Sequence, residues 1–183
     1  MLEALLALAV IAVVIVLWII VTQRRLVMLD ENVSNAMSQI GVQLSGRFDA
    51  LTALLDLTKG YAQQESEIII KTIKARRSLI TAKSSPNQVL KQEEVITEAL
   101  ERIAMVTEKY PQLKANQTYS KAMDAVETYE MMVRTSRLIY NDRVAKLNRE
   151  LRLFPVSLIA KKLGFKKREY LEGLTEKALN QEF

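Results

Sequence analysis

The sequence predicts an all-α protein in which one N-terminal transmembrane helix precedes an antiparallel bundle of three to four long helices. Residues 4–21 contain no charged or polar side chain. The rest of the chain repeats apolar residues at steps of three and four, and only 5 Gly and 3 Pro interrupt that pattern. We predict a membrane anchor with a basic flank at 1–26, a helical bundle at 27–172 and a polar tail at 173–183.

The anchor is predicted from its length. A helix over Ala4–Val21 rises about 27 Å, close to the roughly 30 Å of a bilayer's hydrocarbon core. Trp18 lies near one end, where its amphipathic ring suits the interface. The alternative is a cleaved signal peptide. A retained span is favoured, because no basic residue precedes the run and Gln23 and two arginines replace a small-residue cleavage site.

The flanks of the span predict its orientation. Arg24 and Arg25 follow the apolar run directly, whereas the short N-terminal side carries only Glu3. Basic flanks usually stay in the cytoplasm, so we expect the N-terminus outside and the bundle on the cytoplasmic face of the inner membrane. The absence of Cys fits a reducing compartment.

The first bundle helix is predicted to run unbroken to about Ile80. Its apolar stripe keeps one phase across Gly46 and Asp49, which could otherwise begin a new helix. The stripe consists of Val33, Met37, Ile40, Leu44, Phe48, Leu51, Leu55, Thr58, Ala62, Glu65, Ile69, Ile73, Arg76 and Ile80.

Proline and glycine divide the remaining chain. Ser85, Pro86 and Gln88 predict a capped start for the second bundle helix, which Pro111 ends. The third helix carries a stripe from Tyr119 to Leu151 and stops before Pro155. The short apolar piece that follows contains Val156, Leu158, Ile159 and Leu163 and ends at Gly164.

The composition argues against an enzyme. The chain has no His and no Cys, which removes the usual general base, thiol nucleophile and zinc or haem ligands. The sequence contains no Gly-rich phosphate loop and no tight acidic cluster. We therefore predict no catalytic, cofactor-binding or metal-binding residue; a hydrolase that uses carboxylates alone is a distant alternative.

Several polar residues occupy the apolar stripes. A buried charge without a partner costs several kcal/mol, so these residues should pair with one another or lie at a solvent-exposed edge of the bundle. The structural interpretation is a buried network that sets helix register; the functional one is a polar ligand site, and we favour the former. The residues on the stripes are Glu65, Arg76, Glu130 and Arg137. Asn141 and Asn148 lie one heptad apart on a neighbouring face, and they could belong to the same network or bond backbone at the Phe154-Pro155 turn. Met123, Met131 and Met132 are interpreted as core residues rather than as a partner groove.

A basic segment lies near the C-terminus. Residues 143–168 contain nine basic residues and one acid, a net charge of +8, so the remainder of the chain sums to −3 against the total of +5. Apolar residues such as Phe154 and Ile159 are interleaved with the charges. The segment is a candidate for binding lipid or an acidic partner, through Lys161, Lys162, Phe165, Lys166, Lys167 and Arg168. The alternative is that the apolar residues cap the bundle and the lysines are only solvated. Nucleic acid is not predicted as a partner.

Three stretches resemble the LemA family. The first is Arg47-Phe48-Asp49 with Lys59-Gly60-Tyr61-Ala62 and Glu65, and the second is Tyr110 to Asn116. The third consists of Arg137 to Val144, Leu147-Asn148, Phe154-Pro155, Ile159-Ala160 and Leu163-Gly164-Phe165. Together they cover roughly residues 30–170.

The resemblance implies a bacterial membrane-anchored helical bundle without an established enzymatic activity. By analogy with the family, we expect a non-enzymatic scaffold at the cytoplasmic face that self-associates. The alternative function is an adaptor that presents a client to a membrane enzyme such as a protease. Apart from the lipid bilayer and further copies of the chain, the sequence names no partner.

Overall fold

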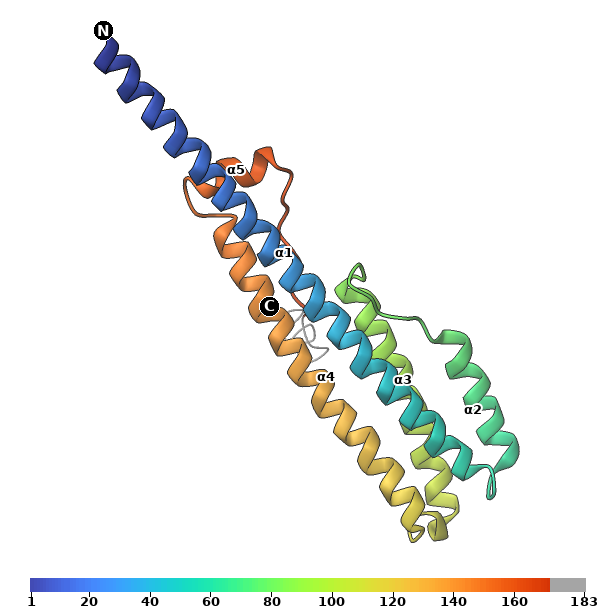
Figure 1. Ribbon diagram of the computed structural model, residues 1–183. Coiled ribbons are helices and arrows are strands. Elements are labelled where there is room, and N and C mark those ends of the chain that lie inside the picture. The colour runs from blue at the N-terminus through green and yellow to red at the C-terminus, as the bar shows by residue number, and fades with distance from the viewer. Residues whose placement is uncertain (172–183) are drawn as a thin grey trace, which may run out of the picture. The chain divides into compact units, whose positions relative to one another are not determined.

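The computed structural model describes residues 1–171, and within them it contains helices and connecting turns without a strand (Figure 1). The all-α prediction is therefore confirmed. The predicted tail at 173–183 lies outside the described residues. The helices are α1 Leu2–Thr58, α2 Gln63–Arg76, α3 Pro86–Lys109, α4 Gln117–Glu150 and α5 Val156–Lys162, with a 3₁₀ turn at Pro111–Leu113.

The chain divides into two compact units. The first unit combines Met1–Ser34 with Asn141–Tyr170, so it contains the apolar start of α1, the end of α4 and all of α5. The second unit contains Asn35–Tyr140 and, among the described residues, Leu171.

The first predicted bundle helix is continuous through Gly46 and Asp49, but it does not reach Ile80. Helix α1 ends at Thr58, whose hydroxyl donates to the Leu55 carbonyl at 2.7 Å. The chain then turns at Gly60, and α2 begins at Gln63. The prediction was wrong because α1 and α2 both turn their apolar stripe to the same core, so the stripe keeps its phase across the break.

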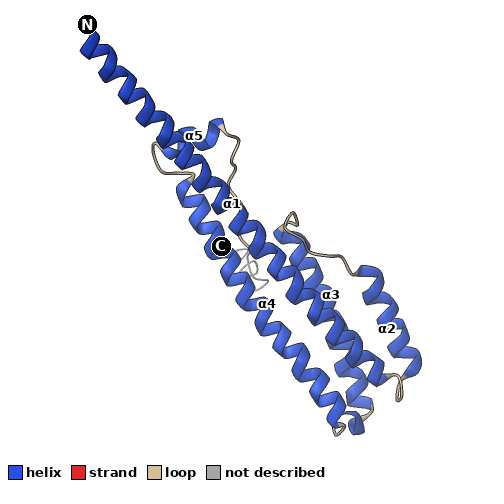
Figure 2. Ribbon diagram, in the orientation of Figure 1, coloured by secondary structure: helices blue, strands red, loops and turns tan. Residues whose placement is uncertain are grey.

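The remaining breaks occur where proline and glycine predict them (Figure 2). Ser85 and Gln88 form the capping box of α3; the Ser85 amide donates to the Gln88 side chain at 2.8 Å. Helix α3 ends before Pro111, and α4 ends before Pro155. After α5, Gly164 adopts a φ of +79°, a left-handed conformation that favours glycine.

In the second unit, α4 lies antiparallel to α1, and α2 and α3 complete the bundle (Figure 1). Large apolar side chains from all four helices are buried between them. These include Ile40, Leu51 and Leu55 of α1, Ile73 of α2, Val89, Ile96 and Ile103 of α3, and Val126 and Val133 of α4. Met131 is 66% exposed and Met132 is also exposed, so their core interpretation was wrong: they lie on the outer face of α4.

The first unit has a small core and a long bare helix. Leu26 and Val33 of α1 are buried, as are Val144 and Leu147 of α4 and Ala160 of α5. The apolar run from Ala4 to Val21 is exposed throughout. Helix α1 is long and apolar enough to cross a membrane, and the described residues bury none of its most apolar 18-residue stretch.

Candidate functional site

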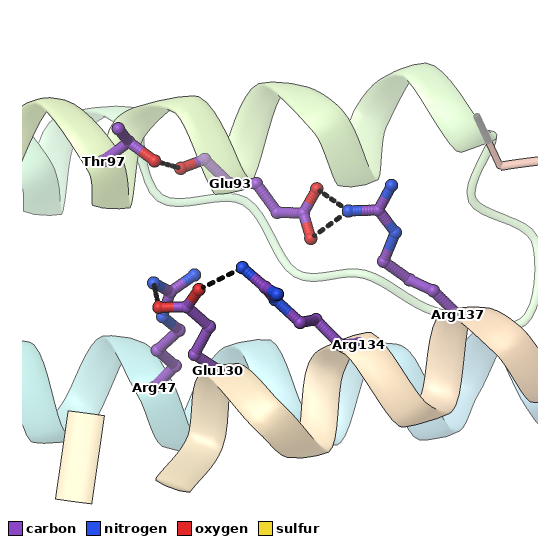
Figure 3. Close-up of polar contacts among 6 residues, drawn as sticks. All are labelled: Arg47, Glu93, Thr97, Glu130, Arg134 and Arg137. Carbon is purple, nitrogen blue, oxygen red and sulfur yellow. Dashed lines mark hydrogen bonds and ion pairs between the residues drawn. The ribbon is translucent and has the colours of Figure 1, made fainter. Parts of the chain in front are cut away.

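A group of charged side chains lies inside the second unit, between α3 and α4 (Figure 3). Arg137 of α4 donates from Nη1 to both carboxylate oxygens of Glu93 of α3, at 3.0 Å each. The Arg137 side chain is 19% exposed and the Glu93 side chain 9%. Burial raises the pKa of the Glu93 carboxyl, and the attraction of Arg137 and Arg47 offsets part of that effect.

A second pair joins α1 to α4. Arg47 donates from Nη2 to Glu130 at 2.8 Å, and Arg134 donates to the other Glu130 oxygen at 3.0 Å. The Arg47 side chain is only 8% exposed, and burial lowers its pKa. Its Nε is buried without a hydrogen-bond partner among the residues that the structure describes. Figure 3 shows that Glu130 lies between the two arginines.

The structure brings only part of the predicted network together. Glu130 and Arg137 belong to this charged cluster, whereas Glu65 and Arg76 lie at the surface and pair with Lys109 and Glu98. They lie near the two ends of α2, where long polar side chains reach water although their backbone positions follow the apolar stripe. Their predicted place in a buried network was wrong, and they lie instead at a solvent-exposed edge, which was the alternative.

Asn148 has a different structural role. It accepts from the Arg168 amide at 3.0 Å and donates to the Arg168 carbonyl at 2.8 Å, which fixes the chain that follows α5. Asn141, one heptad earlier on α4, is half-buried. Asn148 therefore orders a connection within the first unit.

Sequence reasoning missed Glu93 and Arg47. The signal for Glu93 was present, because it lies four residues after buried Val89 and three before buried Ile96. Arg47 is three residues from Leu44 and four from Leu51, both buried. Spacing could therefore have placed both residues at the core. It could not have identified their partners, Arg137 for Glu93 and Glu130 for Arg47.

The charged cluster has the properties of a structural element. Its carboxylates are bound by arginines, and such pairs in a helix bundle select one register among several. Among residues 1–171, no group of three or more His, Cys, Asp or Glu side chains lies close enough to hold a metal ion.

The second unit also has an open groove between α2 and α3, with a volume of about 330 Å³. Ile68, Ile69 and Met105 contribute apolar surface to it, and Arg102 and Lys109 lie at its side. Such a groove can accept an apolar side chain of a partner protein.

The basic segment belongs to the first unit. Arg168 binds Asp30 of α1 through Nε and Nη2, at 2.9 and 3.0 Å, and Arg25 donates to Glu150 at 2.7 Å. Phe154 is 80% exposed and Leu158 is 63% exposed, so these two apolar residues are not buried as a cap of the bundle. Of the predicted lipid-binding or partner-binding residues, Lys161, Lys162, Lys166 and Lys167 are exposed and Phe165 is half-buried.

Comparison with known proteins identifies one family. The sequence model of the LemA family matches residues 36–182, which include α2 to α5 and most of the bundle part of α1. A search of curated proteins gives no match to the chain.

Proposed function

The chain belongs to the LemA family, and on that premise we propose that it is a non-enzymatic scaffold held at a membrane by its N-terminal helix. One observation carries the proposal. The helix whose first residues suit a bilayer is the same α1 that continues to Thr58 and supplies core residues of the second unit. Anchor and bundle therefore share one helix.

The basic flank supports a cytoplasmic location for the bundle. Arg24 and Arg25 follow the span, and positive charge near a span is retained on the cytoplasmic side. Protease added outside intact cells should leave the bundle uncut, whereas protease added to inverted membrane vesicles should digest it. Digestion in intact cells would contradict the cytoplasmic location.

Exposed apolar side chains on α4 support self-association of the scaffold. Met131, Met132 and Leu138 are all exposed, and apolar surface of this kind is typical of a protein interface. We expect the full chain in mild detergent to sediment as an oligomer.

The interface can be tested by substitution. Met131→Glu with Leu138→Glu should shift the chain toward the monomer. The matched control, Gln39→Glu with Ala53→Glu, places acids at exposed α1 positions and should leave the sedimentation unchanged. A chain that sediments as a monomer at all concentrations would exclude self-association.

The open groove between α2 and α3 favours the second candidate, an adaptor that binds one client. Ile68→Glu with Met105→Glu should remove a stoichiometric partner that co-purifies with the chain, while leaving oligomerisation intact. If Met131→Glu with Leu138→Glu removed the partner and the groove variant retained it, the client would bind at α4 and not in the groove.

A further inference from the structure

Helix α5 presents apolar and basic side chains on the same outer face. Leu158 is exposed, and Lys161 and Lys162, three and four residues further on, are its neighbours on the helix surface. Ala160 is buried on the opposite side. The turn before α5 adds Phe154 and the chain after it adds Lys166, both exposed. This lysine-flanked apolar face is unusual for a surface that meets only water.

Contacts within the first unit hold α5 beside the part of α1 that follows the apolar span. Arg25 pairs with Glu150, at the end of α4, and Asp30 pairs with Arg168. Thr22 is 7% exposed, so protein packing on α1 begins within one residue of Val21. Figure 1 shows α5 next to this stretch of α1.

This position corresponds to the headgroup layer of a bilayer. The apolar run ends at Val21, and the charges of Arg24 and Arg25 require a polar environment. The headgroup region extends roughly 5–8 Å beyond each side of the hydrocarbon core, which is about four to five residues of helix. Because Glu150 binds Arg25, the end of α4 lies at the same depth as Arg25, and the turn that contains Phe154 follows directly after it.

The charge of the segment selects the kind of lipid. Asp30, Asp142 and Glu150 are each bound by a basic residue, namely Arg168, Lys146 and Arg25. The exposed lysines of α5 and the following chain add to a stretch with net charge +8. Lysines around exposed apolar side chains are complementary to phosphate groups above acyl chains.

We propose that α5 and the turns that flank it lie on the surface of an anionic bilayer. Phe154 and Leu158 insert between the headgroups, and Lys161, Lys162, Lys166 and Lys167 bind the lipid phosphates. Arg168 is a positioning residue that holds the segment against α1 through Asp30. The inference rests on the proposed anchoring of α1, because that span sets the height of α5.

The absence of Cys allows a direct test on the full chain. Leu158→Cys is labelled with a polarity-sensitive fluorophore, and the protein is reconstituted in vesicles of neutral phosphatidylcholine or with about one third phosphatidylglycerol. In anionic vesicles at low salt, we expect blue-shifted emission and strong quenching by lipid-borne quenchers. Neutral vesicles and high salt should give water-like emission, because salt screens the attraction beyond about 8 Å at physiological strength.

Charge reversal identifies the groups responsible. Each basic residue near an anionic surface strengthens binding about fivefold, so reversing Lys161, Lys162, Lys166 and Lys167 to Glu together should weaken the docked state by at least ~500-fold. The matched control reverses Lys71, Lys74, Lys83 and Lys91, all exposed in the second unit, and should leave the emission blue-shifted. Circular dichroism verifies that both variants retain their helical content.

Two results would overturn the proposal. One is water-like emission in anionic vesicles at the lowest salt, which would leave an acidic protein as the partner of the lysines. The other is equal quenching in neutral vesicles, which would exclude recognition of lipid charge. Flotation of the chain with neutral vesicles tests the anchor separately. A chain that fails to float contradicts the proposed anchoring. A chain that floats but gives water-like emission from position 158 in anionic vesicles contradicts only the docking of α5.

Discussion

The two compact units place their charges differently. In the second unit, the charged groups of Glu93, Arg137 and Arg47 lie inside the bundle and are bound by residues of other helices. In the first unit, Lys161 and Lys162 face outward next to exposed Leu158. The second unit therefore pairs its buried charges with charges of other helices, whereas the first unit exposes lysines beside apolar side chains on one short helix.

Charged residues therefore serve two purposes in this protein, pairing inside the bundle and binding at the surface. A buried ion pair adds little stability compared with apolar packing. Removing one partner is nevertheless costly, because the remaining charge stays in the interior without solvation by water. Exposed lysines contribute almost nothing to folding and remain available for binding.

The largest effect is expected from Arg137→Ala. The substitution leaves the Glu93 carboxylate in the interior without its bidentate partner. We expect a loss of about 3 kcal/mol, the low end of the range for broken buried pairs, because Arg137 retains some exposure. Urea unfolding in detergent, followed by far-UV circular dichroism, measures it. Arg149→Ala, at an exposed position of the first unit, should change stability by no more than about 0.5 kcal/mol. Equal effects would mean that Arg137 is solvated.

Gly41→Ala tests how closely the second unit is packed. A Cβ at Gly41 would lie 2.1 Å from the Ile80 carbonyl oxygen, so the backbone must move. We expect destabilisation by about 1–3 kcal/mol, although alanine is the better helix former. Gly60→Ala is the control, because no atom lies within 4 Å of its added Cβ. A more stable Gly41→Ala protein would show that the connection between α2 and α3, which contains Ile80, does not pack on α1.

Arg47→Met should be tolerated. Arg47 is buried with an unsatisfied Nε, and its partner Glu130 keeps Arg134 when Arg47 is lost. Methionine fills similar volume without a charge, so we expect stability to stay within about 1 kcal/mol of the parent or to rise. The same urea titration measures it. A loss comparable to that of Arg137→Ala would show that Arg134 cannot satisfy Glu130 alone.

Reversal of the four exposed lysines of the basic segment should barely affect folding. In detergent without anionic lipid, we expect the Lys161, Lys162, Lys166 and Lys167→Glu protein to unfold within about 0.5 kcal/mol of the parent. A thermal scan in neutral detergent measures it, with the second-unit lysine reversal as comparison. Strong destabilisation would mean that these lysines hold the first unit together.

The pH dependence of stability tests the burial of Glu93. Burial raises the pKa of Glu93 above its ordinary value of 4.5. The folded protein then holds this proton more tightly than the unfolded chain, so the stability from Glu93 is present below 4.5 and is lost as the pH rises through the raised pKa. Glu93→Gln does not titrate, so the stability of the parent relative to this variant should decrease from pH 4.5 upward. A relative stability that increases over this window would show that Arg137 outweighs the burial.

Much of the fold could be predicted from local signals. The apolar run to Val21, the capping box at Ser85, and the breaks before Pro111 and Pro155 depend on residues that are neighbours in the chain. Such signals act through backbone hydrogen bonding and side-chain burial within one helix, so the sequence by itself determined the helices and the candidate anchor.

The pairing of the helices depends on contacts between residues that are distant in the chain. Periodicity identifies a buried stripe but not its partner, so it could not end α1 at Thr58 or pair Arg137 with Glu93. It also could not distinguish Arg76, whose side chain is 43% exposed at the end of α2, from Arg137, whose side chain is 19% exposed. The exposure of Phe154 likewise depends on how α5 packs on α1, because burial is set by what the rest of the chain covers.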